Sequence, residues 1–179
     1  MKLRTLALFA VVAGLSAASG VAYQLWSRGG DAGPATDPDA IVERVLRARV
    51  ADVKGATQSL EQWHGQVLVV NYWATWCAPC REEIPGFVRL QERYGSRGLQ
   101  FVGIAIDQPD KVAEFASEFR INYPLLLGGL ETIELLRQAG NRAGVLPYTL
   151  VIDRNGNLVR REPVGLKEAR LESLLLPLL

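Results

Sequence analysis

Asn71–Phe87, NYWATWCAPCREEIPGF, decides the fold, because it joins a strand pattern to a helix pattern across two cysteines. The strand pattern is Val67–Trp73, a continuous run of β-branched and aromatic residues, as a strand buried on both faces requires. The helix is predicted over Pro79–Tyr94, where a proline fits the first turn because its missing N–H has no partner there. Cys77 and Cys80 therefore lie where a buried strand gives way to a helix.

This placement of two thiols indicates thiol–disulfide exchange. Such exchange needs a thiolate that attacks and a second thiol close enough to release the mixed disulfide. Cys77, at the predicted helix N-terminus, faces unpaired N–H groups and the positive end of the helix dipole, which should lower the pKa of its thiol. Cys80 lies one turn further on and is expected to be more buried and less reactive. The chain has only these 2 cysteines, so a scaffold of several disulfides is excluded.

A metal site is the alternative interpretation of the cysteine pair. Zinc takes four nitrogen or sulfur ligands, and the chain has only 1 histidine, His64, and no second Cys-x-x-Cys motif. Copper(I) accepts two thiolates, so a copper(I) carrier that uses the same thiols stays open as the alternative function. We predict no metal ligand and no cofactor other than the redox-active disulfide Cys77–Cys80.

The N-terminus differs from the rest of the chain. Residues 5–27 carry no charge and follow Lys2 and Arg4. A helix over residues 5–27 would be roughly 34 Å long, which exceeds the about 30 Å of a bilayer's hydrocarbon core. We predict a signal-anchor helix over residues 1–27 with its N-terminus in the cytoplasm. A cleaved signal peptide, with a cleavage site near residues 16–18, is the alternative, and both interpretations export the remainder.

Three regions are predicted along the chain: the anchor at 1–27, a flexible linker at 28–44 and an α/β domain at 45–179. The linker is rich in Gly, Pro and Asp, although a short helix or the start of a strand is possible from residue 41. The domain begins with strand–helix–strand patterns and ends with a hairpin and a helix. That order predicts a central mixed β-sheet flanked by helices. The net charge of +1 excludes a strong positive electrostatic field that would attract nucleic acid at long range.

The stretch Trp76–Cys80, WCAPC, resembles the active site of the thioredoxin superfamily. The wider string at 71–85, NYWATWCAPCREEIP, is similar to that of the superfamily's membrane-anchored TlpA/ResA-like branch. Leu146–Thr149, LPYT, lies before a strand and resembles the family's cis-proline loop. A helix and a strand within 107–129 resemble the insert of that branch. The likeness covers residues 45–179 and implies a thioredoxin-like fold.

The resemblance also implies roles for single residues. Cys77 would be the attacking thiol and Cys80 the resolving thiol, and Glu83 would tune both. Pro147, in the cis form, would leave the backbone of Leu146 to pair with an extended substrate.

Two further positions belong to this comparison. Trp76 would cover the site and contact the substrate. Asn71 departs from thioredoxins proper, which carry a buried aspartate at that position. An amide cannot accept the resolving thiol's proton, so Glu83 or water would have to accept it.

The resemblance implies a thiol–disulfide oxidoreductase of the bacterial inner membrane, single-pass, with its catalytic domain in the periplasm. Its partners would be disulfide-containing exported proteins, in cytochrome c maturation or oxidase assembly, and an integral membrane electron donor. The opposite direction, donation of disulfides, stays open, because no residue pattern resolves a potential difference of about 30 mV. A peroxidase is disfavoured, because peroxide-reducing relatives place their resolving cysteine far along the chain.

Overall fold

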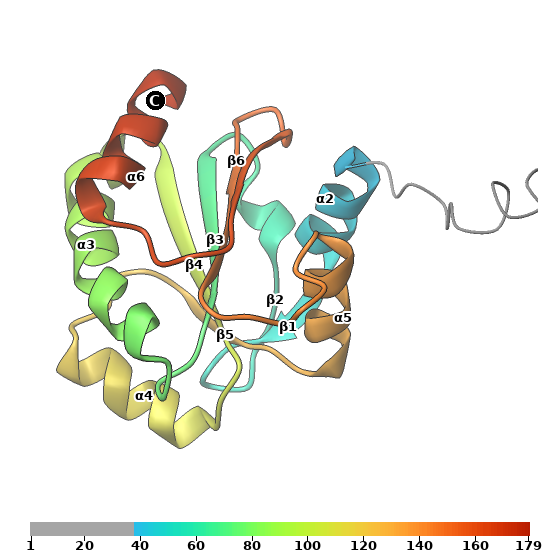
Figure 1. Cartoon of the computed structure of the whole chain (residues 1–179), viewed down its shortest axis with the longest axis vertical. Helices are drawn as coiled ribbons and strands as arrows, with labels where there is room; N and C mark the ends of the chain where they lie inside the picture. Colours follow the sequence, from blue (N-terminus) through green and yellow to red (C-terminus); the bar gives the residue numbers. More distant parts are fainter. Residues whose placement is uncertain (1–37) are drawn as a thin grey trace, which may run out of the picture. The chain divides into compact units, whose positions relative to one another are not determined.

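A five-stranded mixed β-sheet forms the centre of the computed structural model, which describes residues 38–179 (Figure 1). The strand order is β5-β4-β3-β6-β7. Strands β3, β4 and β5 are parallel, whereas β6 runs antiparallel to β3 and β7 antiparallel to β6. The bounds of these strands are β3 Val67–Trp73, β4 Leu99–Ala105, β5 Leu125–Leu127, β6 Tyr148–Ile152 and β7 Leu158–Glu162. The sheet predicted from the sequence is confirmed.

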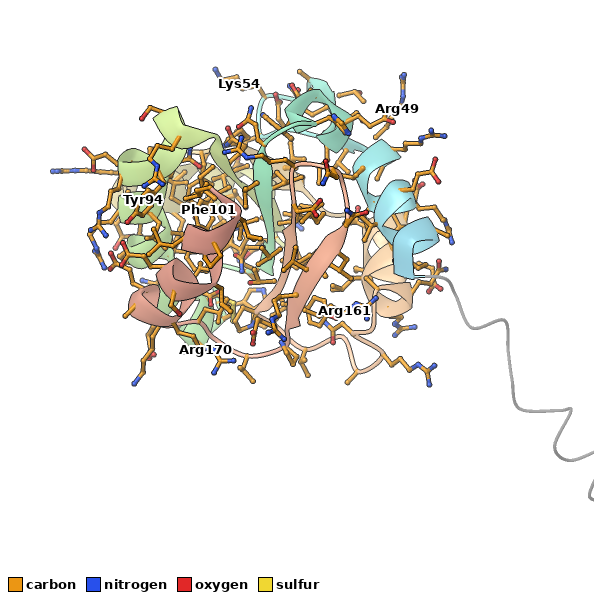
Figure 2. All side chains as sticks on the ribbon, turned by 90° about the horizontal axis from the view of Figure 1, so that it is seen from above. Arg49, Lys54, Tyr94, Phe101, Arg161 and Arg170 are labelled. Carbon is orange, nitrogen blue, oxygen red and sulfur yellow. A yellow bond between two sulfur atoms is a disulfide. The ribbon has the colours of Figure 1, made fainter. Side chains whose placement is uncertain are left out.

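Helices cover both faces of the sheet, which explains why every residue of β3 is buried. Side chains of α3, α4 and α6 pack into one hydrophobic core, and side chains of α2 and α5 into a second core on the opposite face. The bounds are α2 Pro38–Arg47, α3 Ala78–Tyr94, α4 Pro109–Glu118, α5 Leu130–Gln138 and α6 Glu168–Leu175. In Figure 2, Phe101 lies among the packed side chains of the first core, where its ring stacks on Phe87 with 5.1 Å between centroids.

Helix α2 corrects the predicted boundary between linker and domain. It begins at Pro38, so residues 38–44, assigned to the flexible linker, belong to the folded part. The reason is packing, since Ile41, Val42 and Val45 are each 1% exposed. The expected anchor at 1–27, its cleaved alternative and the linker up to residue 37 lie outside the described residues. Within 38–179, no helix is long and apolar enough to cross a membrane.

The two edges of the sheet end differently. At the β5 edge, Asp52 forms an isolated antiparallel bridge with Leu126. Asp52 follows β1 (Arg49–Ala51), which pairs with β2 (Thr57–Ser59) in a small separate ribbon. At the other edge, β7 exposes three successive side chains, Val159, Arg160 and Arg161, the last of which is labelled in Figure 2.

Candidate active site

Cys77 and Cys80 form a disulfide at the N-terminus of α3. Cys77 is the N-cap residue of α3, and its Sγ accepts a hydrogen bond from the backbone N–H of Cys80 at 3.4 Å. Cys77 is 5% exposed and Cys80 is fully buried. Of the two cysteines, Cys77 is therefore the more accessible to a second molecule. As the dithiol, Cys77 would present its sulfur to the unpaired N–H groups of the helix, which favours the thiolate.

Asp107 fixes the turn that leads into Cys77. It lies two residues beyond β4, and its Oδ2 accepts hydrogen bonds from Thr75 N–H at 3.1 Å and from Thr75 Oγ1 at 2.5 Å. Its Oδ1 accepts from Gln108 N–H at 2.8 Å. Burial opposes ionisation of this carboxyl group, but the bonds from Thr75 and Gln108 outweigh it and hold the pKa of Asp107 below its usual value.

Arg81 lies on the next turn of α3 and makes a second contact with this turn. Its Nη1 donates to Thr75 O at 3.3 Å. Its guanidinium lies over two stacked rings of the α4 segment, 5.0 Å from the Phe115 centroid and 5.2 Å from the Phe119 centroid. Such cation–π contacts orient the guanidinium. The positive charge is thereby held close to the active-site turn.

Glu83 is a buried carboxyl group beside the disulfide and not an ordinary helix-surface residue. It is 4% exposed and lies three residues after Cys80, so both side chains are on the same face of α3. Its Oε1 accepts from Asn71 Nδ2 at 2.9 Å, and its Oε2 accepts from the backbone N–H of Leu166 at 2.8 Å. Strand β3 and the loop before α6 thus hold the carboxyl group from two sides.

The pKa of Glu83 is raised from 4.5 to about 7. Burial is the main cause, because it disfavours the charged form, and the hydrogen bonds from Leu166 and Asn71 offset only part of this effect. A carboxyl group with a pKa near neutrality can both accept and release a proton under physiological conditions. Glu83 is therefore suited to exchange a proton with a neighbouring thiol.

Asn71 connects Glu83 to β6. Its Nδ2 donates to Thr149 Oγ1 at 3.0 Å as well as to Glu83. The contact with Thr149 follows from the strand register, because Asn71 pairs with Thr149 across β3 and β6. The Oδ1 atom of Asn71 is buried and has no hydrogen-bond partner among the described residues. The amide thus directs its donor group, and not its acceptor, at the carboxyl group.

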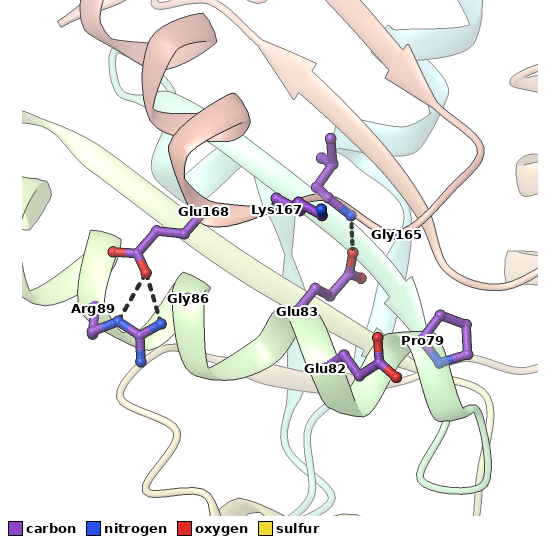
Figure 3. A pocket seen from close by; sticks show the side chains of 9 residues that line it. Pro79, Glu82, Glu83, Gly86, Arg89, Gly165, Lys167 and Glu168 are labelled. Atoms are coloured by element: carbon purple, nitrogen blue, oxygen red, sulfur yellow. Dashed lines mark hydrogen bonds and ion pairs between the residues drawn. The ribbon is translucent and has the colours of Figure 1, made fainter.

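A pocket of about 460 Å³ opens beside Glu83 (Figure 3). The loop between β7 and α6 forms one wall. A Cβ atom on Gly165 would lie 3.5 Å from Pro79 Cβ and 3.9 Å from Glu83 Oε2, so this loop passes over both residues. Across the pocket, Arg89 pairs with Glu168 at 2.6 Å and joins α3 to α6. The pocket gives solvent a route to the vicinity of the buried carboxyl group.

The predicted substrate contacts lie in two loops. The Leu146–Pro147 peptide bond is cis, the geometry that the resemblance implies. Leu146 is half-buried and its side chain packs against both cores. Trp76 is 68% exposed, so its side chain is available to another molecule. The substrate-binding roles of Trp76, Leu146 and Pro147 stay predictions.

Sequence reasoning missed several residues of this arrangement. Asp107 had a usable signal, because it directly follows a buried parallel strand, and functional side chains gather at the carboxyl ends of such strands. Thr149 was identified only as part of the cis-proline motif, since its link to Asn71 depends on the register of β3 and β6.

Within 38–179, no group of three or more His, Cys, Asp or Glu side chains is arranged to hold a metal ion.

Comparison with known proteins agrees with this geometry. The AhpC/TSA family model matches residues 41–161. The chain is 29% identical over 110 residues to the thiol-disulfide oxidoreductase ResA of Geobacillus thermodenitrificans, covering 61% of each chain. It is 25% identical over 135 residues to that of Halalkalibacterium halodurans, covering 74% of each. The matched part thus spans about three fifths, 61%, of the Geobacillus protein's length.

A solved structure is also similar. The thiol:disulfide interchange protein of the thioredoxin family from Chlorobium tepidum has 30% identity and a TM-score of 0.66, covering 75% of this chain and 97% of that one. The resemblance to the thioredoxin superfamily and its ResA-like members is confirmed. Because the family model covers more than half of its length, the chain belongs to the AhpC/TSA family and has a thioredoxin-like fold.

Proposed function

We propose that the protein is a thiol–disulfide oxidoreductase that reduces disulfides of other proteins through Cys77 and Cys80. The observation that carries this proposal is the disulfide at the start of α3, in which Cys77, at 5% exposed, is the more accessible residue and Cys80 is fully buried. The buried carboxyl group of Glu83, on the same face of the helix, supports it. The names of the similar proteins support thiol–disulfide exchange as the chemistry.

The reaction begins with the dithiol form. The Cys77 thiolate attacks one sulfur of a substrate disulfide, so that a mixed disulfide forms and the other substrate sulfur leaves as a thiolate. Cys80 then loses its proton and attacks the Cys77 sulfur, which releases the second substrate thiolate. The substrate gains two electrons, and the protein is left with the Cys77–Cys80 disulfide. A dithiol donor must reduce this disulfide again before the next cycle.

Glu83 accepts the proton that Cys80 loses. A group with a pKa of about 7 is partly ionised at neutral pH, so it can take the proton as the thiolate attacks. The bond from Asn71 favours the ionised form between turnovers. The pocket beside Glu83 lets the proton pass on to solvent. This role answers the problem raised by Asn71, whose amide cannot act as the base.

We further propose that the domain works in the periplasm, tethered by residues 1–27. Support comes from the uncharged stretch at 5–27 that follows Lys2 and Arg4. Its substrates would be exported proteins with disulfides, such as apocytochrome c or copper-carrying oxidase assembly factors, and an integral membrane protein would supply electrons. Protease treatment of spheroplasts tests the location: degradation of the domain is expected, and protection until the membrane is dissolved would contradict it.

Trapping of mixed disulfides tests the proposed chemistry. Cys80→Ser should accumulate covalent adducts with substrate proteins, because the mixed disulfide at Cys77 cannot be resolved. Cys77→Ser is the matched control, since its remaining thiol is buried and should trap little. Adducts are detected on non-reducing gels and disappear with dithiothreitol. Equal trapping by both variants, or by neither, would reject the roles.

A second measurement separates exchange from metal transport. The wild-type protein should reduce a disulfide-bonded protein such as insulin over repeated cycles with dithiothreitol. Stoichiometric, tight binding of copper(I) without such turnover would instead favour the carrier function.

A further inference from the structure

The loop at 140–147, which leads into the cis-proline, contains a buried asparagine that the proposed reaction does not use. Asn141 is 3% exposed. Its Oδ1 accepts a hydrogen bond from Val145 N–H at 3.0 Å, and its Nδ2 donates to Val145 O at 2.7 Å. One buried amide therefore binds both backbone groups of a single residue. We propose that Asn141 is a positioning residue that fixes the peptide-binding edge at Leu146, an inference that rests on the proposed function.

Asn141 is itself held firmly by the end of α5. Its backbone N–H donates to Leu136 O at 3.1 Å, and its backbone C=O accepts from Gly144 N–H at 3.0 Å. Gly144 has a φ of +64°, which glycine adopts without strain. On the far side of the proline, the Tyr148 hydroxyl donates to Ala139 O at 2.9 Å. Both ends of the loop are thus attached to the same helix terminus.

Within residues 38–179, these bonds leave Leu146 as a residue of the loop whose backbone groups are free to pair with a peptide. Both backbone groups of Val145 are engaged by Asn141, and Pro147 has no N–H. Among the described residues, the backbone N–H and C=O of Leu146 have no hydrogen-bond partner. Leu146, next to the proline, therefore offers both a free backbone donor and a free acceptor to an extended peptide that pairs with this loop as an added strand. Because Val145 is fixed, the position of Leu146 is set before the peptide arrives, which reduces the entropy lost on binding.

Exposure argues that the bonds serve position more than stability. Val145 is 45% exposed as a residue and its two bonds to Asn141 are only partly buried, so these bonds do not serve to satisfy fully buried backbone groups. A buried amide forms both bonds, and it fixes the backbone at the residue before the pairing edge. Loss of Asn141 should therefore weaken binding of a peptide disulfide much more than it slows the chemistry at the sulfurs.

The test compares two disulfides that differ in having a peptide backbone. Reduced wild-type protein and Asn141→Ala, as full-length chains, are mixed with an extended peptide of about twelve residues that carries one disulfide, or with bis(2-hydroxyethyl) disulfide. The half-saturating concentration of the peptide should rise about 3- to 10-fold, with its maximal rate within about twofold. The rate with the small disulfide should not change.

Asn157→Ala is the matched control. It removes an asparagine whose Nδ2 donates to Asp153 Oδ2 at 3.0 Å in the β6–β7 turn, and it should leave both rates unchanged. An unchanged half-saturating concentration for Asn141→Ala would overturn the proposal. Equal slowing with both disulfides would overturn it too, because it would show general damage to the site.

Asn141→Asp provides a test that does not depend on the alanine variant folding. The protonated carboxyl group can donate to Val145 O and accept from Val145 N–H, whereas the ionised group repels the carbonyl. The defect in peptide binding, relative to wild type at the same pH, should therefore shrink as the pH falls. A pH-independent defect, or none, would contradict the proposal.

Hydrogen exchange tests the wild-type protein directly. The backbone amide of the exposed residue Val145 should exchange slowly, because it donates to Asn141. Fast exchange would reject the proposal that Asn141 fixes the backbone of Val145. These outcomes are distinct from failure of the proposed function. If that function is wrong, wild-type protein reduces neither disulfide; if only this inference is wrong, it reduces both and Asn141 has no selective effect.

Discussion

The carboxyl group of Glu83 joins acid–base chemistry to stability at the scale of one residue. Its pKa of about 7 in the folded protein exceeds the ordinary value of 4.5, so the folded state favours the protonated form. The contribution to stability is fully present below pH 4.5 and is lost as the pH rises through 7. A shift of this size corresponds to roughly 3 kcal/mol.

Glu83→Gln should remove this pH dependence. Urea unfolding of the oxidised protein at pH 5 and pH 8 measures it, with the wild-type chain and the variant compared at each pH. The stability of wild type relative to the variant should fall by up to roughly 3 kcal/mol over that interval. A constant difference would show that Glu83 titrates normally.

The same variant should change the reactivity of the reduced protein. An ionised carboxylate disfavours a nearby thiolate, so its removal should move the pH profile of Cys77 alkylation to lower pH. Iodoacetamide labelling of reduced wild type and Glu83→Gln measures the profile. Glu82→Gln is the matched control, because Glu82 neighbours Glu83 on α3 but is exposed. Superimposable profiles for all three proteins would remove Glu83 from the site.

Thr149 tests the far end of the same network. Thr149→Val keeps the shape of the side chain but leaves one buried N–H of Asn71 without its acceptor, which should cost about 1–3 kcal/mol. Thermal or urea unfolding measures the loss. Thr132→Val, a change at a buried threonine outside the network, should cost less. An equal loss in the two variants would mean that the bond to Asn71 adds nothing.

At the scale of elements, the order of the active-site turn depends on the end of β4. Asp107→Ala removes the acceptor for both groups of Thr75, so the turn before Cys77 should become mobile. We expect faster exchange of the Thr75 amide and slower reaction of the reduced protein with bis(2-hydroxyethyl) disulfide.

A matched control exists in the β6–β7 turn. Asp153 accepts from the N–H groups of Asn155 and Asn157 at 2.9 and 2.8 Å. Both Asp107→Ala and Asp153→Ala remove an acceptor of two hydrogen bonds in a turn, so each should reduce the free energy of unfolding by about 1–3 kcal/mol. Asp153→Ala should leave the reaction rate unchanged. If both variants slow the reaction equally, the effect of Asp107 is one of general stability.

Helix α2 gives the second prediction at this scale. Ile41→Ala should destabilise the protein by about 2–5 kcal/mol, because it opens a cavity in the core beneath α2 and α5. Urea unfolding measures the change. Glu43→Ala, on the exposed side of the same helix, should change stability by less than about 0.5 kcal/mol. A similar small effect of Ile41→Ala would mean that α2 does not belong to the cooperative unit.

At the scale of the whole molecule, the sheet and its helices follow from local patterns in the sequence. The run Val67–Trp73 is apolar enough to be identified as a strand covered on both faces, and β3 has those bounds. The start of the domain was placed too late, because the apolar residues Ile41, Val42 and Val45 are close to a Gly- and Pro-rich stretch. Their burial depends on α5, which is distant in sequence.

Some features of the candidate site follow from local sequence patterns, and others depend on contacts that form only in the folded protein. Cys77 and Cys80 are separated by only two residues, so their geometry could be inferred from a single helix start. Two other contacts, of Glu83 with Leu166 and of Asn141 with Val145, depend on the conformation of loops in the folded protein. No local pattern encodes those contacts, and only the family resemblance pointed to Glu83.

The unlike edges of the sheet have a consequence for crowded copies of the chain. An exposed strand edge is a template on which a second molecule can extend the sheet and start an aggregate. The Asp52 bridge covers part of the β5 edge, and Arg160 and Arg161 make the β7 edge mutually repulsive. We expect concentrated solutions of the wild-type protein to remain free of aggregates. Replacement of both arginines by valine should produce aggregates that bind an amyloid dye at concentrations where the wild-type solution stays clear.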